Sequence, residues 1–95
     1  MNVHVSEKLL EHTGAAIRRQ RLAEGLGLKE LARLSGLSIS ALSLIETGKR
    51  DPRLSTLDRI AKSLGTEVST FFKDPEDDEL KARNSEPGYD LSEFE

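Results

Sequence analysis

The sequence has no cysteine in its 95 residues. It can therefore form neither a disulfide framework nor a thiolate metal site. No stretch approaches the roughly 20 consecutive apolar residues of a membrane-spanning helix. The N-terminal residues MNVHVSEKLL also lack the basic start and apolar run of a signal peptide. From these absences we expect a cytoplasmic protein that does not associate with membranes.

Residues suited to catalysis or metal binding are also scarce. The only histidines, His4 and His12, have a spacing that matches no metal-binding pattern. No serine has an evident general base, and no glycine-rich loop is present to cradle a phosphate. The acidic run DPEDDE lacks the glycine and the alternating ligands of a calcium loop. We therefore predict a protein that is not an enzyme and needs no cofactor.

The charge of the chain is divided unevenly along its length. The net charge is −3, but residues 1–73 hold 12 Lys and Arg against 8 Asp and Glu, whereas residues 74–95 hold 2 against 9. The length allows one domain. The sequence thus predicts a mildly basic domain over residues 1–73 and an acidic, partly disordered tail over residues 74–95, where Pro87 and Gly88 argue against regular structure.

The spacing of apolar residues predicts an all-α domain. We expect five helices, at about 7–23, at 28–35, at 39–47, a fourth that starts after Ser55 and is terminated by Gly65, and a short one that carries Phe71 and Phe72. Hydroxyl side chains are expected to cap three of them, namely Ser6, Ser38 and Ser69, while Gly27 takes that position before the second. Thr13 and Gly14 weaken the prediction that the first helix is unbroken.

Residues 28–47, LKELARLSGLSISALSLIET, have the pattern of a DNA-binding helix-turn-helix. Ala32 is small where two helices would cross, and Gly36 supplies the backbone freedom for the turn. Leu42 and Ile45 would bury the second helix, which becomes the candidate reader of the major groove. Two amphipathic helices of an ordinary small bundle are the alternative interpretation of this stretch alone.

The match extends beyond that stretch, and the chain resembles the Xre family of phage-repressor-like helix-turn-helix domains from about Gly14 to Phe72. The segments that carry the resemblance are IRRQR, GLGLKELA, GLSISALSLIE, TGKRDP, LSTLDRIAKSLG and VSTFF, in this order. The resemblance implies a five-helix, lambda-repressor-like domain. It also implies that Arg21 and Glu46 pair across the interior, a mainly architectural contact in which Arg21 has further donors for phosphate.

Double-stranded DNA is the partner that this resemblance implies. We expect base contacts from Ile39, Ser40, Ser43 and Leu44. We expect contacts with the DNA backbone from Arg18, Lys29, Ser38, Thr47, Lys49, Arg50 and Arg53. The sequence departs from the best-known repressors because Leu28, Ile39 and Leu44 stand where polar residues are common. Specificity for DNA would then depend on apolar contact with thymine methyl groups and on DNA shape. The alternative is that this apolar face binds a protein.

Our principal prediction is a dimeric repressor that binds palindromic operators. The apolar residues expected at the dimer interface are Leu64, Val68, Phe71 and Phe72, with one of the two phenylalanines in the core. The alternative is an antitoxin-type interaction module whose apolar face or acidic tail binds a partner protein. The segment EPGYDLSEFE, with Tyr89, Leu91 and Phe94, resembles a short motif that orders on binding, and the tail could also compete with DNA for the basic loop.

Overall fold

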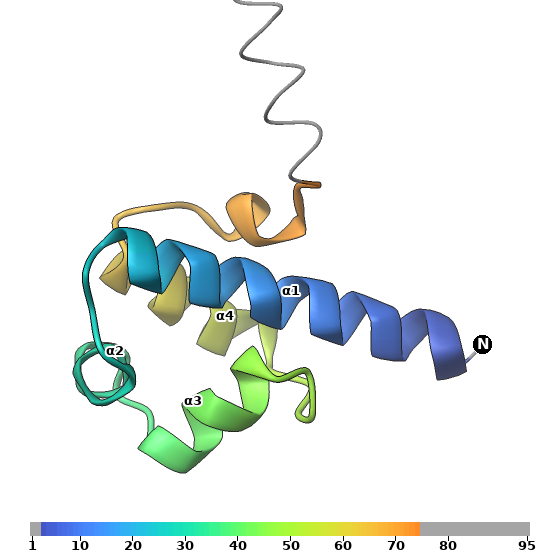
Figure 1. The fold of residues 1–95 in the computed structure, drawn as a ribbon, viewed down its shortest axis with the longest axis horizontal. Helices are drawn as coiled ribbons and strands as arrows, with labels where there is room; N and C mark the ends of the chain where they lie inside the picture. The colour runs from blue at the N-terminus through green and yellow to red at the C-terminus, as the bar shows by residue number, and fades with distance from the viewer. Residues whose placement is uncertain (1–2, 75–95) are drawn as a thin grey trace, which may run out of the picture.

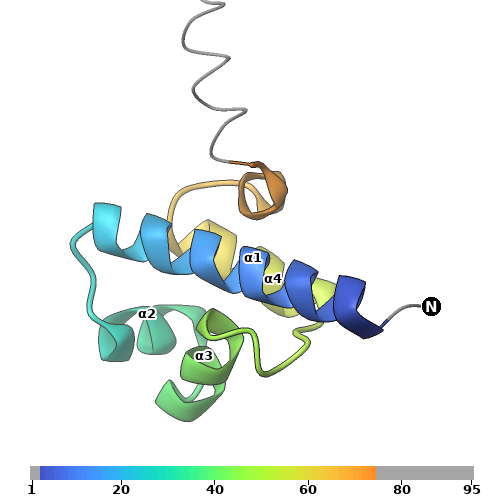
Figure 2. The same ribbon diagram turned by 45° about the vertical axis from the view of Figure 1, so that its right-hand side comes forward.

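The computed structural model describes residues 3–74, and helices are the only regular secondary structure over that range. Four α-helices, α1 (Val3–Ala23), α2 (Leu28–Ser35), α3 (Ile39–Glu46) and α4 (Leu54–Ser63), precede a 3₁₀ helix, η1 (Val68–Phe72). In two views, α2 and α3 lie on one side of α1 and η1 lies on the other (Figures 1 and 2). The predicted all-α class is confirmed, with a 3₁₀ helix as the last short element. No helix in this range is long and apolar enough to cross a membrane.

Each of the five elements places one large side chain fully inside the core. These side chains are Ile17, Leu31, Leu42, Ile60 and Phe71. Burying an aliphatic or aromatic side chain contributes about 1.5–3 kcal/mol relative to leaving it exposed. Ala32 is also buried, as predicted from the need for a small residue between α2 and its neighbours. One core therefore joins all the elements, and no single helix needs to be stable alone.

The turn between α2 and α3 forms as the sequence predicted. Gly36 has a φ of +73°, in the left-handed region that glycine reaches without a steric penalty. The backbone N–H of Leu37 donates to the Ala32 carbonyl at 2.8 Å, which closes the end of α2. The Ser38 hydroxyl then accepts a hydrogen bond from the N–H of Ala41 at 3.0 Å and caps α3.

Three other helix starts differ from the predictions. α1 begins at Val3, so Ser6 lies inside it, and the helix continues unbroken through Thr13 and Gly14. α4 begins at Leu54 because the Arg53 carbonyl accepts the N–H groups of both Thr56 and Leu57. η1 is preceded by Glu67, whose carbonyl accepts the N–H of Thr70, so Ser69 lies within the helix and does not cap it.

The predicted dimer residues divide between core and surface. Phe71 and Leu64 are buried within the chain, so neither side chain adds surface to an interface between copies, and Phe71 is the phenylalanine expected in the core. Val68 is half-buried against the core, and Phe72 is exposed. Adjacent residues of a short helix point in different directions, so only one of two successive phenylalanines can reach the core. Phe72 and Val68 remain as the surface part of that prediction.

Candidate nucleic-acid interface

The side of α3 that faces away from the core carries the four residues predicted to read bases: Ile39, Ser40, Ser43 and Leu44. The buried residues of this helix are Leu42, Ile45 and Glu46. An α-helix turns about 100° per residue, so Ser40 and Leu44 lie opposite the buried set, whereas Ile39 and Ser43 lie at its edge. Ile39 is 46 % exposed, Ser40 is also exposed, and Ser43 and Leu44 are half-buried. The exposed side of α3 thus combines short hydroxyls with branched apolar side chains.

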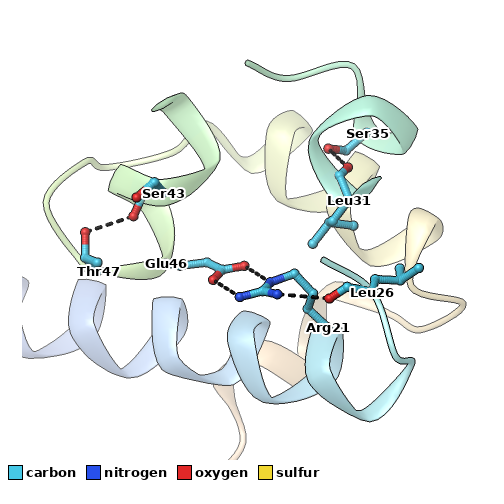
Figure 3. Close-up of polar contacts among 7 residues, drawn as sticks. All are labelled: Arg21, Leu26, Leu31, Ser35, Ser43, Glu46 and Thr47. Atoms are coloured by element: carbon cyan, nitrogen blue, oxygen red, sulfur yellow. Dashed lines mark hydrogen bonds and ion pairs between the residues drawn. The ribbon is translucent and has the colours of Figure 1, made fainter. Parts of the chain in front are cut away.

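An ion pair between Arg21 and Glu46 ties α3 to α1. Nε of Arg21 donates to Oε2 of Glu46 at 2.8 Å, and Nη2 donates to Oε1 at 3.0 Å (Figure 3). The remaining nitrogen, Nη1, donates to the Leu26 carbonyl at 2.9 Å. Both charged side chains are buried. The expected pair is therefore present, and all three guanidinium nitrogens of Arg21 donate to protein acceptors.

The environment of Arg21 favours its charged form. The hydrogen bond to Glu46 raises the pKa of the Arg21 guanidinium above its ordinary value. Burial lowers the pKa and opposes this rise, while the negative charge of Glu46 adds to it. Arg21 thus serves as a permanent cation that orients the carboxylate of Glu46, and with it the end of α3.

Close backbone packing also holds the end of α3 against α1. A methyl group added at Gly14 would lie 2.6 Å from the Glu46 carbonyl oxygen, and closer still to the carbonyl oxygen of Ile45. Gly48 approaches α1 in the same way, since its added methyl group would lie 2.8 Å from Cα of Glu11. These neighbouring atoms belong to the backbone and cannot rotate away. Two glycines therefore set how deeply the end of α3 sits against α1.

Basic side chains gather in the segment that follows α3. Lys49, Arg50 and Arg53 are all exposed. Both arginines line a hollow of about 320 Å³ whose other walls include Ala41 and Ile45 of α3. The structure thus brings these two predicted backbone contacts to one place beside the candidate reading helix.

The two hydroxyl residues at the ends of α3 differ in what they can donate. Ser38 uses an oxygen lone pair to cap the helix, so its hydroxyl hydrogen can be given to a phosphate. The Thr47 hydroxyl donates to the Ser43 carbonyl at 2.9 Å (Figure 3) and also lies 3.3 Å from the Leu44 carbonyl. A phosphate contact from this hydroxyl would require its hydrogen to turn away from the helix.

The other predicted backbone contacts lie on different elements. Arg18 is exposed on α1, and Lys29 is exposed in the first turn of α2. Glu30 lies in the same turn as Lys29, where its carboxylate offsets part of the attraction that a helix N-terminus has for an anion. Within the described residues, no group of three or more histidine, aspartate or glutamate side chains could hold a metal ion.

Two features of the site do not follow from the sequence patterns above. The Leu26 carbonyl is a backbone acceptor that no side-chain pattern identifies. Gly14 weakens the prediction of its own helix, although a glycine inside a helical pattern is also a signal of close packing. Both features depend on how separate elements meet in space.

Two short helices crossing at a tight turn, with the second helix exposed beside a basic loop, define a helix-turn-helix domain. Residues 17–71 match the Helix-turn-helix family HTH_3, and the chain belongs to this family.

Relatives with the same domain include named regulators. The chain is 41 % identical over 63 residues to the HTH-type transcriptional regulator PuuR of Escherichia coli, and the aligned part covers 66 % of this chain. The match covers 34 % of PuuR, so the chain corresponds to about a third of that protein's length.

Solved structures of the same fold are also similar in sequence. One is the restriction-modification controller protein C.AhdI from Aeromonas hydrophila, with 35 % identity, a TM-score of 0.65, and coverage of 66 % of this chain and 96 % of that one. Another is the clp gene regulator ClgR from Corynebacterium glutamicum, with 34 % identity, a TM-score of 0.66, and coverage of 67 % and 82 %.

Proposed function

We propose that this chain is a sequence-specific, double-stranded-DNA-binding transcriptional regulator, a dimeric repressor that acts on palindromic operators. The observation that carries the proposal is the exposed side of α3, held against α1 by Arg21 and Glu46 and flanked by Arg50 and Arg53. In this arrangement α3 enters the major groove while the arginines approach the phosphates at its edge.

Base recognition in this proposal relies on small contacts. Ser40 and Ser43 have short hydroxyls that can donate to or accept from several bases, so they discriminate weakly. Ile39 and Leu44 offer apolar contact to thymine methyl groups. The rest of the specificity comes from the free energy needed to deform the DNA around α3, because this free energy depends on the DNA sequence.

We infer a dimer because a single helix-turn-helix domain contacts only a short stretch of DNA. One α3 contacts only a few base pairs, so two copies related by a two-fold axis, with half-sites about 34–36 Å apart, are needed for an adequate site. Phe72 and Val68 on η1 supply the apolar surface between the copies. The name of PuuR, a transcriptional regulator, supports the same class of function.

The test is selection of bound sequences from a random DNA pool, followed by a salt titration of the winning site. We expect an enriched palindrome whose affinity falls steeply with salt concentration. Replacing Arg50 or Arg53 by Gln should reduce the salt slope by about 0.9 for each phosphate that the variant no longer neutralises. Lys62→Gln is the matched control, because Lys62 is exposed at the far end of α4 from Arg53.

The exposed apolar side chain of Ile39 favours a second candidate, a face that docks a partner protein in the manner of an antitoxin. The two candidates give opposite results in the selection. No enriched sequence at low salt would contradict the DNA-binding proposal and favour the protein-docking face. An enriched palindrome that changes in Ile39→Ser would instead assign Ile39 to base recognition.

A further inference from the structure

An apolar groove of about 190 Å³ lies between the first half of α1, the start of α4, and η1. Its apolar lining consists of Leu9, Leu10, Pro52, Leu54, Leu57 and Phe72. Three of these large side chains are strongly exposed: Leu54 at 68 %, Leu9 at 54 % and Phe72 at 46 %. Scattered exposed apolar residues are ordinary, but several gathered around one groove mark a binding surface.

The groove is distinct from the exposed side of α3, although the two surfaces meet at one loop. η1 lies on the opposite side of α1 from α2 and α3 in both views (Figures 1 and 2). Asp51 and Pro52 line the groove and also line the hollow that contains Arg50 and Arg53. Whatever occupies the groove therefore lies next to the basic loop.

We propose that the C-terminal segment of this chain, residues 86–95 (EPGYDLSEFE), docks into this groove. The described chain ends at Asp74, two residues after Phe72, so the segment is tethered at the edge of the groove. Residues 75–88 can span up to about 3.3–3.6 Å each. This length is sufficient for Tyr89, Leu91 and Phe94 to reach the groove. A tether of this kind raises the local concentration of the segment to about the millimolar range.

The composition of the segment matches the groove. Tyr89, Leu91 and Phe94 place three large apolar side chains within six positions, close together in a region that is otherwise acidic. Apolar side chains of this size can cover the exposed leucines and Phe72 of the groove. The favourable free energy of docking comes from removing the apolar surfaces of the segment and of the groove from water.

The segment has four carboxylates and no lysine or arginine. Arg53 is exposed and adjoins the groove residue Leu54, so a docked segment brings its carboxylates near this arginine. The groove as a whole has charged neighbours of both signs, since Asp51 is a lining residue, Glu11 follows Leu10 and Asp58 follows Leu57. The match between the segment and the groove therefore rests on the apolar side chains.

Docking has a consequence for DNA binding that rests on the function proposed above. A docked segment holds carboxylates near Arg53, where they oppose the approach of phosphates. It also covers Phe72, which the proposed dimer needs. The tail therefore lowers the affinity of the chain for DNA until a DNA site or another ligand displaces it.

The test uses the full chain and two introduced cysteines, because the natural sequence has none. Leu54→Cys is combined with Leu91→Cys, the protein is oxidised mildly at high dilution, and cross-linking is followed by non-reducing electrophoresis and intact mass. The control combines Leu22→Cys with Leu91→Cys. Leu22 is 56 % exposed and lies about 18 Å farther along α1 than Leu10, at 1.5 Å per residue.

We expect the Leu54 pair to close within one chain at least tenfold faster than the Leu22 pair. Adding Tyr89→Ser and Phe94→Ser, which preserve the charge of the segment, should reduce the rate to that of the control. Equal rates for the two pairs would overturn the proposal. Cross-links that form only between chains would also overturn it, and would assign the groove to a second copy.

A binding measurement tests the consequence for DNA separately. The full chain with Tyr89→Ser, Leu91→Ser and Phe94→Ser should bind a random-sequence 20-base-pair duplex several-fold more tightly at low salt than the natural chain. Unchanged affinity would refute the inhibitory effect. The cross-linking result needs no DNA, so its failure counts against docking alone, whereas failure of the DNA selection counts against the proposed function.

Discussion

Arg21 on α1 and Glu46 on α3 are joined by two parallel hydrogen bonds of 2.8 and 3.0 Å. The same guanidinium reaches the Leu26 carbonyl between α1 and α2, so one side chain connects three parts of the fold. α3 has only eight residues, far fewer than an isolated helix needs to be stable in water. Its orientation therefore depends on tertiary contacts, and this ion pair is one of them.

Replacing Glu46 by Ala should destabilise the domain strongly. The substitution leaves the buried guanidinium of Arg21 without its carboxylate, a change that typically costs about 3–5 kcal/mol. Urea denaturation followed by circular dichroism measures the change in the free energy of unfolding. The double variant Arg21→Met with Glu46→Leu removes both charges and should recover most of the stability. A double variant as unstable as Glu46→Ala would contradict this account.

The contribution of Arg21 should not vary with pH around neutrality. Its pKa is raised in the folded state, so the stability that it contributes is complete below the ordinary arginine pKa of the unfolded chain, which lies far above neutral, and is lost only above the still higher folded value. Denaturation of the natural chain and of the double variant Arg21→Met with Glu46→Leu, which leaves no unpaired carboxylate, should therefore give a constant difference at several pH values near neutral. A difference that changes with pH would require another titrating group to act through Arg21.

Replacing Gly14 by Ala should be far more harmful than helix propensity suggests. Alanine is favoured over glycine in a helix by about 1 kcal/mol. Here, however, the added methyl group meets the backbone of α3 at 2.6 Å from the Glu46 carbonyl oxygen. Overpacking against immobile atoms costs about 1–3 kcal/mol or more, so we expect a net loss of stability in thermal denaturation.

Gly27→Ala is the control for that substitution. An added methyl group at Gly27 has only the end of the Glu30 side chain nearby, at 3.7 Å. Its cost should be limited to the weaker capping by alanine, about 1 kcal/mol or less. Equal losses of stability for the two variants would show that close packing at Gly14 is unimportant.

Substitutions at Ser38 should separate capping from DNA contact. Ser38→Ala removes the cap of α3 and should cost about 1 kcal/mol of stability. Ser38→Asp restores an oxygen acceptor for the Ala41 N–H, so stability should return. Its negative charge repels phosphate, so its affinity for the selected DNA should fall below that of the natural chain in fluorescence anisotropy. Natural affinity in Ser38→Asp would exclude a phosphate near this residue.

The two adjacent phenylalanines should behave differently. Phe71 is fully buried, so Phe71→Ala should cost about 3–5 kcal/mol of stability. Phe72 is about half exposed, so Phe72→Ala should leave the fold nearly unchanged and shift the monomer–dimer equilibrium toward monomer. Chemical denaturation and sedimentation velocity measure the two effects. An unchanged dimer in Phe72→Ala would remove this residue from the proposed interface.

Much of the helix-turn-helix is predictable because its signals are local. The bounds of α2, the left-handed Gly36 and the cap at Ser38 all depend on residues within a few positions of one another. α4 begins at Leu54, before the predicted start after Ser55, because the Arg53 carbonyl receives the first helical hydrogen bonds. Residues 75–95 of the acidic tail lie outside the described residues, and the division of the tail from the domain stays a prediction.

The sequence by itself determined the helical class, the small residue at the crossing and the side of α3 that can be exposed. The spacing of apolar residues and the choice of turn-forming residues act over one or two helical turns, and both patterns are clear in this sequence. Only the tertiary structure decided that Phe71 is buried while Phe72 is not, that Arg21 uses all three nitrogens internally, and that Gly14 lies against α3. These outcomes depend on which distant segments meet, and the spacing of residues along one helix carries no information about the direction from which its neighbours approach.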